Sequence, residues 1–345
     1  MEEAFDIAKA SSKHGGLVVV RKGQLVFERY FGRGHRYAAH NLASCAKSFT
    51  RVAVGRLMDE NPEQFSAGLE QKVFTTLHMP EDLFPLNDPR KSDIKLGQLL
   101  SMTAGIRGNS PGFIKGKPTT VDPPGPDGWQ ACLDRTAATV DLWCSPGSGF
   151  SYATAGVHML SMMIRRITGM ELQAYIQDRI ATPLQWGAWG WGYRRKEVTH
   201  TPGGGGIAVR APDMIRFGEL LLNDGRWRGQ QVIASDYVRA CGRLSNYNPH
   251  TAYSLQFDVN GDRHVPDVPG DAFWKTGSGG HCLYVVPSLE TVIWKLGGRD
   301  EQYSSANTGI EDSRDYDSSR EGWKSGITEA QGAIRALQTI AAAVA

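Results

Sequence analysis

The stretch Asn41-Leu42-Ala43-Ser44-Cys45-Ala46-Lys47-Ser48-Phe49-Thr50 places a serine three residues before a lysine, where a helical pattern begins. Apolar residues recur after it at spacings of three and four, which predicts a helix that ends at Asn61-Pro62. Residues i and i+3 share one face of a helix, so we expect Lys47 to reach the Ser44 hydroxyl. A desolvated lysine can take the proton of a serine, which is otherwise a weak nucleophile at neutral pH. The stretch therefore predicts a nucleophilic serine.

The same spacing occurs a second time, at Ser92-Asp-Ile-Lys95, so spacing alone does not identify the nucleophile. Ser92 is well placed to N-cap a helix that begins near Ile94. The first copy instead opens an apolar helix, whose N-terminus favours negative charge that develops near Ser44. We therefore interpret Ser44 and Lys47 as catalytic candidates and Ser92 as a structural residue.

Strand-like sequences lie near both ends of the chain and helical patterns lie between them. Two β-hairpins are predicted from β-branched and aromatic runs around short turns, at 16–31 and 281–296. The prediction is an α+β fold, in which an antiparallel sheet built from both chain ends is flanked by terminal helices and interrupted by a mostly helical domain. Its boundaries are residues 1–50 and 251–345 for the sheet domain and 51–250 for the helical domain, with the active site at their interface. Residues 107–128 are rich in glycine and proline, which predicts a long irregular loop.

The composition is that of an ordinary globular enzyme and excludes several classes of partner. Of the 345 residues, 41% are hydrophobic and 21% are charged, with a net charge of +2. The 38 basic and 36 acidic residues are mixed along the chain, so neither nucleic acid nor an anionic membrane is an expected partner. No apolar stretch approaches the roughly 18 residues of a transmembrane helix. We expect a small-molecule partner, and the sequence leaves the oligomeric state open.

The N-terminus, Met1-Glu2-Glu3-Ala4-Phe5, is acidic and lacks the features of a signal peptide. This predicts a cytoplasmic protein, or a periplasmic one if the sequence is truncated. The five cysteines are scattered without C-x-x-C spacing, which predicts buried free thiols rather than disulfides. The nine histidines show no paired metal spacing, so we expect no metal and no cofactor.

Three motifs follow one another in a characteristic order: Ser44-x-x-Lys47, Tyr152-x-Thr154 and Lys275-Thr276-Gly277-Ser278. Linking phrases accompany them, among them Leu99-Leu100-Ser101-Met102-Thr103-Ala104-Gly105 and Gly204-Gly205-Gly206-Ile207. With these motifs the chain resembles the serine β-lactamase and penicillin-binding-protein superfamily from about residue 15 to 298. The resemblance is greatest to its class C β-lactamase-like and esterase branch.

The resemblance implies a role for each matched residue. Ser44 corresponds to the acylated nucleophile, Lys47 to its base, and Tyr152 to the residue that moves protons to the leaving group and the deacylating water. The backbone N–H groups of Ser44 and Ser278 correspond to the oxyanion hole. Lys47 must then have a lowered pKa, which burial and a neighbouring positive charge can provide, and Lys275 is the candidate neighbour.

The substrate-binding side of the pattern departs from the superfamily at Thr154, where an asparagine is usual. That amide normally contacts the acyl-amide side chain of a β-lactam or peptide, so its absence favours other substrates. Lys275, Thr154, Gly277 and Ser278 are the implied substrate-binding residues. Since the esterase branch often lacks Lys-Thr-Gly, the resemblance leaves open whether Lys275 or His281 takes part.

These observations predict a cofactor-free serine hydrolase that acts through a Ser44 acyl-enzyme on a carboxylic ester or small amide. One alternative is a β-lactamase, D-aminopeptidase or acyltransferase with the same machinery, and another is a catalytically silent binding protein of the same fold. Six tryptophans are expected near the cleft, where aromatic walls suit an apolar acyl or aryl group: Trp129, Trp143, Trp186, Trp189, Trp191 and Trp274.

Overall fold

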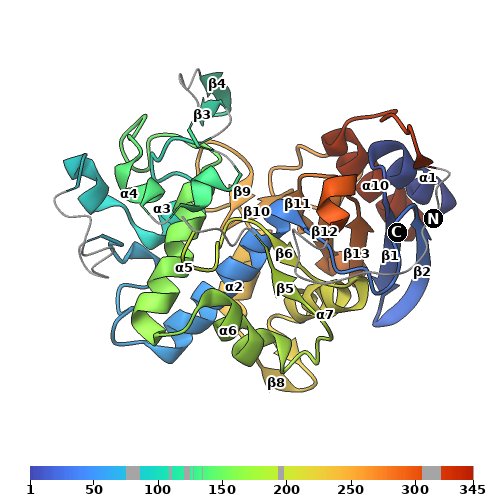
Figure 1. Ribbon diagram of the computed structural model, residues 1–345, viewed down its shortest axis with the longest axis horizontal. Helices are drawn as coiled ribbons and strands as arrows, with labels where there is room; N and C mark the ends of the chain where they lie inside the picture. Colours follow the sequence, from blue (N-terminus) through green and yellow to red (C-terminus); the bar gives the residue numbers. More distant parts are fainter. Residues whose placement is uncertain are drawn as a thin grey trace.

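The fold was obtained as a computed structural model and consists of a sheet on one side and a mostly helical part on the other (Figure 1). The structure describes residues 1–74, 86–108, 111–119, 125–126, 128–133, 135–192, 198–304 and 320–344. This mixed α+β architecture with one large antiparallel sheet is the predicted one.

The sheet has seven antiparallel strands in the order β2-β1-β13-β12-β11-β10-β9. Its strands are β1 (Gly15–Arg21), β2 (Gln24–Phe31), β9 (Tyr253–Ser254), β10 (Phe257–Val259), β11 (Phe273–Gly277), β12 (His281–Val286) and β13 (Thr291–Leu296). The two predicted hairpins are therefore confirmed. They meet where β1 pairs with β13, for example with Val18 opposite Trp294, so both ends of the chain share one sheet.

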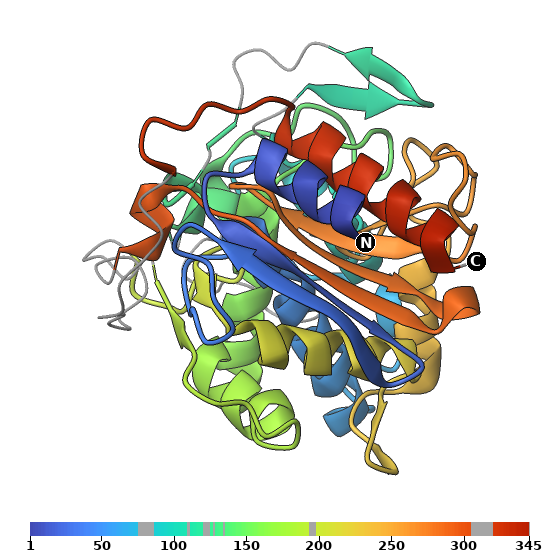
Figure 2. The same cartoon turned by 90° about the vertical axis from the view of Figure 1, so that its right-hand side faces the viewer.

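The outer face of the sheet is covered by the two terminal helices, α1 (Glu2–Ser11) and α10 (Glu329–Val344), which lie side by side across it (Figure 2). Side chains alternate between the faces of a strand, so Tyr284 packs under these helices while its neighbour Leu283 faces the helical part. Every residue of β12 and β13 is buried, because both faces of these strands are covered. For this reason each strand contains an apolar run, at 282–286 and at 292–294.

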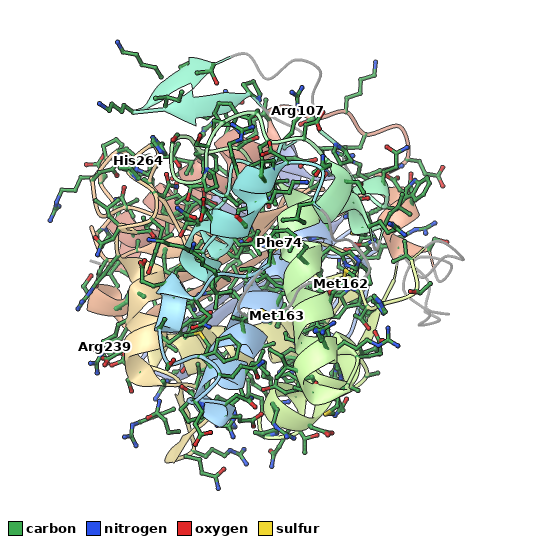
Figure 3. The ribbon with its side chains drawn as sticks, turned by 90° about the vertical axis from the view of Figure 1, so that its left-hand side faces the viewer. Phe74, Arg107, Met162, Met163, Arg239 and His264 are labelled. Atoms are coloured by element: carbon green, nitrogen blue, oxygen red, sulfur yellow. The ribbon has the colours of Figure 1, made fainter. Side chains whose placement is uncertain are left out.

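The inner face packs against a helical layer centred on α2 (Ala46–Glu60). The other described helices are α3 (Leu96–Leu100), α4 (Thr136–Thr139), α5 (Thr154–Thr168), α6 (Leu172–Ile176), α7 (Ala211–Leu222) and α8 (Ser235–Arg239). One apolar cluster runs from the inner sheet face through these helices and includes Phe74 and Met163, labelled in Figure 3. Phe49 of α2 stacks on Phe217 of α7 at a centroid distance of 4.2 Å. The sheet and the helices thus share one core, and α2 is held from several sides.

Helix α7 comes from the predicted helical segment yet lies directly on the sheet. A Cβ added at Gly218 would lie 2.3 Å from Val292 Cγ1 of β13, so only glycine allows this approach. The boundaries at residues 50 and 251 stay a prediction, since the shared core offers no clear division there.

The segment 107–128, predicted to be irregular, contains a short hairpin of β3 (Gly112–Ile114) and β4 (Lys117–Thr119) at the edge of the molecule (Figure 1). The two turn residues, Lys115 and Gly116, have φ angles of 47° and 75°. Two successive left-handed residues give the twist that a two-residue hairpin needs. The prediction of irregular structure is wrong here because glycine-rich composition also supplies tight turns. Residues 109–110, 120–124 and 127 of this segment lie outside the described residues. Two-residue strands form further pairs: β5 (Gly190–Trp191) with β6 (Ile207–Ala208), and β7 (Arg226–Trp227) with β8 (Gln230–Gln231).

Candidate active site

The candidate nucleophile, Ser44, lies in a 3-10 turn (Ala43–Cys45) that leads into α2. Ala43 has a left-handed φ of 47°, which is unfavourable for a residue with a Cβ atom. The turn is held in place because Asn41 Oδ1 accepts a hydrogen bond from the Ala43 N–H at 2.8 Å, and the Leu42 N–H donates to Ile207 O at 2.8 Å. The surrounding protein therefore fixes the backbone that presents Ser44.

Lys47 lies one helical turn after Ser44, and its Nζ donates to Ser44 Oγ at 2.9 Å. The lysine is fully buried, and its Nζ also donates to Gly204 O at 2.5 Å. Burial lowers the pKa of Lys47, and the nearby charge of Lys275 lowers it further. The structure thus places a lysine with a lowered pKa in contact with the serine, which is what a general base for Ser44 requires.

Tyr152 lies two residues before the start of α5, and both lysines are close to its ring. Its hydroxyl accepts a hydrogen bond from Lys275 Nζ at 3.0 Å and is also hydrogen-bonded to Ser44. Lys47 Nζ lies 5.0 Å from the centre of its ring. Burial alone would raise the pKa of Tyr152, but the charges of Lys275 and Lys47 outweigh it and lower that pKa. This position suits a group that gives and takes protons beside the nucleophile.

Lys275 lies on β11 and joins Tyr152 to a second tyrosine, because its Nζ also donates to Tyr253 Oη at 3.2 Å. Burial disfavours the charged lysine, but the interactions with Tyr152, Tyr253 and the carboxyl group of Asp258 raise its pKa above the ordinary value. Lys275 is therefore the cation of the site. This supports the expectation that Lys275 is the positive neighbour of Lys47.

Tyr253 is a site residue that sequence reasoning missed. It comes from the two-residue edge strand β9, and its hydroxyl also contacts Gln256 Oε1 at 3.2 Å. Its ring lies 6.1 Å from that of Tyr152, in an edge-on arrangement. A single tyrosine in so short a strand belongs to no motif, so only the strand order of the sheet reveals it.

Gly277 and Ser278 lie where β11 ends against residues 41–45, the segment that presents Ser44 and is called the nucleophile turn. A Cβ atom on Gly277 would come within 2.3 Å of Leu42 O and 3.1 Å of Cys45 Sγ, so glycine is required for this approach. Ser278 follows as an exposed residue. The approach brings together the two segments whose backbone N–H groups, those of Ser44 and Ser278, are the implied oxyanion donors.

Thr154 lies against the glycine whose carbonyl accepts the hydrogen bond from Lys47, whereas backbone groups engage His281. Thr154 is buried at the start of α5, where its Cγ2 packs against Gly204. His281 is buried as well: its Nδ1 accepts from the Gly297 N–H at 3.0 Å, and the ring also hydrogen-bonds to the backbone of Asn41. Both ring nitrogens of His281 are thus engaged within the protein, and Lys275 is the residue beside Tyr152.

The second copy of the serine–lysine spacing forms no pair. Ser92 lies in a 3-10 helix (Pro89–Asp93), where its hydroxyl donates to Pro89 O at 2.7 Å. The prediction that Ser92 caps the next helix is wrong, because α3 begins at Leu96 after Lys95, which pairs with Glu70. The tryptophan prediction is wrong in part as well: Trp274 packs on the outer face of the sheet, away from Ser44.

Within the described ranges, no cluster of three or more His, Cys, Asp or Glu side chains is arranged to hold a metal ion. Among the same residues, no helix is both long and apolar enough to cross a membrane. All five cysteines are free, and four of them are buried.

The fold agrees with comparisons to known proteins. The family model described as Beta-lactamase matches residues 7–307, so the chain belongs to the Beta-lactamase family. A candidate 6-aminohexanoate-dimer hydrolase from Bacillus anthracis is similar with a TM-score of 0.64 and 24% identity, over 88% of this chain and 76% of that one. A candidate β-lactamase from Bacteroides dorei gives a TM-score of 0.65 and 17% identity, over 88% and 92% of the two chains. EstCE1, a hydrolase with promiscuous acyltransferase activity, gives a TM-score of 0.64 and 16% identity, over 88% of this chain and 93% of that one. At these identities the structures establish the fold alone, and the family is generally hydrolytic.

Proposed function

We propose that the chain is a serine hydrolase that forms an acyl-enzyme on Ser44 from a carboxylic ester or a small amide. The observation that carries this proposal is the 2.9 Å hydrogen bond between Lys47 Nζ and Ser44 Oγ. It lies in a buried site that also holds Tyr152 and the cation Lys275, 3.0 Å apart. Acyl transfer needs a nucleophile, a base for it, and a second group that transfers protons. Ser44, Lys47 and Tyr152 fit these roles, and the charged Lys275 holds Tyr152 in place.

In the proposed acylation, Ser44 Oγ bonds to the substrate carbonyl carbon while its proton passes to the neutral amine of Lys47. The backbone N–H groups of Ser44 and Ser278 stabilise the negative charge on the carbonyl oxygen. Tyr152 then gives its proton to the leaving alcohol or amine as the bond between that group and the acyl carbon breaks. The resulting phenolate of Tyr152 lies between two positive charges, Lys47 and Lys275.

In the proposed deacylation, the Tyr152 phenolate takes a proton from water, and the hydroxide attacks the acyl carbon. The bond from that carbon to Ser44 Oγ breaks, and Oγ takes back the proton held on Lys47. The acid is released, and Ser44, Lys47 and Tyr152 return to their starting protonation states. The 2.9 Å contact between Lys47 Nζ and Ser44 Oγ, and the hydrogen bond between Tyr152 and Ser44, support this sequence of steps.

The ester preference is supported by Thr154. A threonine in place of the usual asparagine removes the amide that would contact the side chain of a β-lactam or peptide. We therefore expect hydrolysis of p-nitrophenyl acetate and butyrate to exceed that of nitrocefin. Strong nitrocefin turnover with inert esters would reverse this preference.

The nucleophile is tested by intact-mass measurement after labelling with a fluorophosphonate. One adduct is expected on the wild type and none on Ser44→Ala. Ser92→Ala, in the second copy of the same spacing, is the matched control and should label like the wild type. An adduct that persists in Ser44→Ala, or no adduct on the wild type, would refute the Ser44 assignment.

A further inference from the structure

One buried side chain connects the two segments that carry the proposed oxyanion donors. Gln302 lies in a 3-10 helix (Asp300–Tyr303), and its Nε2 donates to Asn41 O and to Ser278 O, each at 2.9 Å. The Asn41 N–H in turn donates to Gln302 O at 3.0 Å. Gln302 thus binds the nucleophile turn through both its backbone and its side chain, and the loop after β11 through its side chain.

The orientation of this amide is determined by its other end. The Arg299 N–H donates to Gln302 Oε1 at 3.0 Å, so the opposite atom must be the NH2 group that faces the two carbonyls. Only an amide of this length offers an acceptor on one side and two donors on the other. The contacts therefore depend on the chemistry of glutamine as well as on its size.

His281 also contacts the backbone of Asn41. Because the Gly297 N–H donates to His281 Nδ1, the proton of the neutral ring is on Nε2, and the ring hydrogen-bonds to the backbone of Asn41. Burial, together with the neighbouring His40, lowers the pKa of His281 well below its ordinary value, so the ring stays neutral. Gln302 and His281 therefore fix Asn41 from one side.

A displacement of Asn41 would be transmitted to the nucleophile. Its Oδ1 accepts from the Ala43 N–H and holds Ala43 at a φ of 47°, directly before Ser44. On the other segment, Gly279 and Gly280 have φ angles of 101° and 88°, so the loop after Ser278 is tightly turned. Its outer side is bound by Ser12, which donates to Gly279 O at 3.0 Å, while Gln302 connects it to the nucleophile turn.

We propose that Gln302 is a positioning residue that sets the separation of the Ser44 and Ser278 N–H groups, so that both reach one developing oxyanion. The inference rests on the proposed serine hydrolase function. Without Gln302 both N–H donors are still present, but the distance between them is no longer fixed. Since an oxyanion hole acts only when its donors are already in place, the loss falls on the transition state.

The test compares ester and thionoester substrates that differ only in the carbonyl atom. In Gln302→Glu, the donor NH2 becomes an oxygen that faces two carbonyls, and we expect kcat/KM for a p-nitrophenyl ester to fall about 10- to 100-fold. The matching thionoester gains less from the N–H donors, because sulfur is a weaker acceptor on a longer bond. Its rate should fall less, so the ester-to-thionoester ratio of kcat/KM should drop, by an amount that approaches the fold-loss of the ester as the thionoester becomes insensitive to the donors.

Asn260→Asp is the matched control, because Asn260 is a buried amide with the same pattern of contacts elsewhere. Its Nδ2 donates to Val265 O and Val268 O, each at 3.0 Å, and its Oδ1 accepts from the Val265 N–H at 2.9 Å. We expect this variant to lose thermal stability with an unchanged ester-to-thionoester ratio. Gln302→Met, which buries no charge, is the second Gln302 variant and should lower the ratio as Gln302→Glu does.

A folded Gln302 variant with the wild-type ratio would overturn the positioning role. So would failure of both Gln302 variants to fold while Asn260→Asp folds, because Gln302 would then be structural. Failure of the proposed function looks different: the wild type itself would hydrolyse no ester and form no fluorophosphonate adduct.

Discussion

The hydroxyl of Tyr253 lies 3.2 Å from Lys275 Nζ, so Lys275 has two tyrosine partners, with Tyr152 at 3.0 Å. A hydrogen bond to a charged group typically contributes about 1.5–3 kcal/mol. Tyr253→Phe keeps the ring and removes that bond, while Tyr152 still holds the lysine. We expect kcat/KM for p-nitrophenyl butyrate to fall about tenfold, with a loss of stability of about 1.5–3 kcal/mol.

Tyr247→Phe is the control for this substitution. The Tyr247 hydroxyl donates to Glu70 Oε1 at 2.6 Å, and Glu70 takes part in none of the contacts of the site. We expect its kcat/KM to equal that of the wild type. If Tyr253→Phe behaved in the same way, Tyr253 would only fill space beside Lys275.

The two proposed proton-transfer groups should each be essential for turnover. Lys47→Ala removes the base that contacts Ser44, and Tyr152→Phe removes the hydroxyl that contacts Lys275 but keeps the ring. General acid–base groups typically contribute about 10²–10⁴-fold, so each variant should lower kcat for p-nitrophenyl acetate at least about 100-fold. Lys95→Ala, in the second serine–lysine copy, should retain wild-type turnover. A near-wild-type rate for Lys47→Ala or Tyr152→Phe would contradict its assigned role.

The pH profile should reflect the opposite pKa shifts of the two lysines. Lys47 acts as a base only when neutral, and its pKa is lowered by burial, so kcat/KM should rise with pH through a value below 10.5. Lys275 stays charged beyond pH 10.5, because Tyr152 and Tyr253 raise its pKa against the effect of burial. Tyr152 is an acid only while it is protonated, and the charges of Lys275 and Lys47 lower its pKa, so activity should fall again as the pH rises through a value below 10.0. Kinetics of ester hydrolysis across pH, corrected for spontaneous hydrolysis, measure both limits.

Lys275→Met tests the origin of this profile. Removing the positive charge removes one cause of the lowered Lys47 pKa, so the rise in kcat/KM should move to higher pH. Lys275→Arg keeps the charge and should leave the rise where it is, even where the rate is lower. An unmoved rise in Lys275→Met would mean that Lys275 does not influence Lys47.

The sequence predicted the sheet and the Ser44–Lys47 contact because both depend on local spacing. The β-branched runs favour strands, and the i, i+3 relation brings two side chains to one face where the segment is helical, as it is from Ser44 to Lys47 but not from Ser92 to Lys95. Tyr253 and Gln302 could not be found in this way. Both act through contacts with residues far away in the chain, and the strand order and the packing of two loops decide those contacts.

His281 and Ser92 show why a residue type in a plausible place is weak evidence. His281 follows the Lys-Thr-Gly motif by only a few residues, yet backbone groups of Gly297 and Asn41 engage its ring. Ser92 bonds within its own 3-10 helix, whose geometry depends on the preceding Pro89. In both cases the local backbone conformation determines which hydrogen-bond partner the side chain has.

The four glycines that begin at Gly203 provide the last prediction. A Cβ atom on Gly204 would lie 2.4 Å from Thr154 Cγ2, and Gly204 O accepts the hydrogen bond from Lys47. Gly204→Ala should therefore destabilise the protein by about 1–3 kcal/mol, as overpacking of a core does, and should lower kcat/KM by displacing the partner of Lys47. Chemical denaturation and ester kinetics measure the two effects.

The atom with which the new Cβ would clash also indicates a second substitution that should restore the variant. Thr154→Ser removes Cγ2, so the double variant Gly204→Ala/Thr154→Ser should recover much of the stability and activity that Gly204→Ala loses. Gly326→Ala is the control, since its Cβ atom would come no closer than 3.8 Å to any neighbour. A Gly204→Ala variant as stable as Gly326→Ala, or a double variant no better than the single one, would show that this contact does not limit the site. Recovery in the double variant would demonstrate that the packing of Thr154 against Gly204 positions the carbonyl that accepts the hydrogen bond from Lys47.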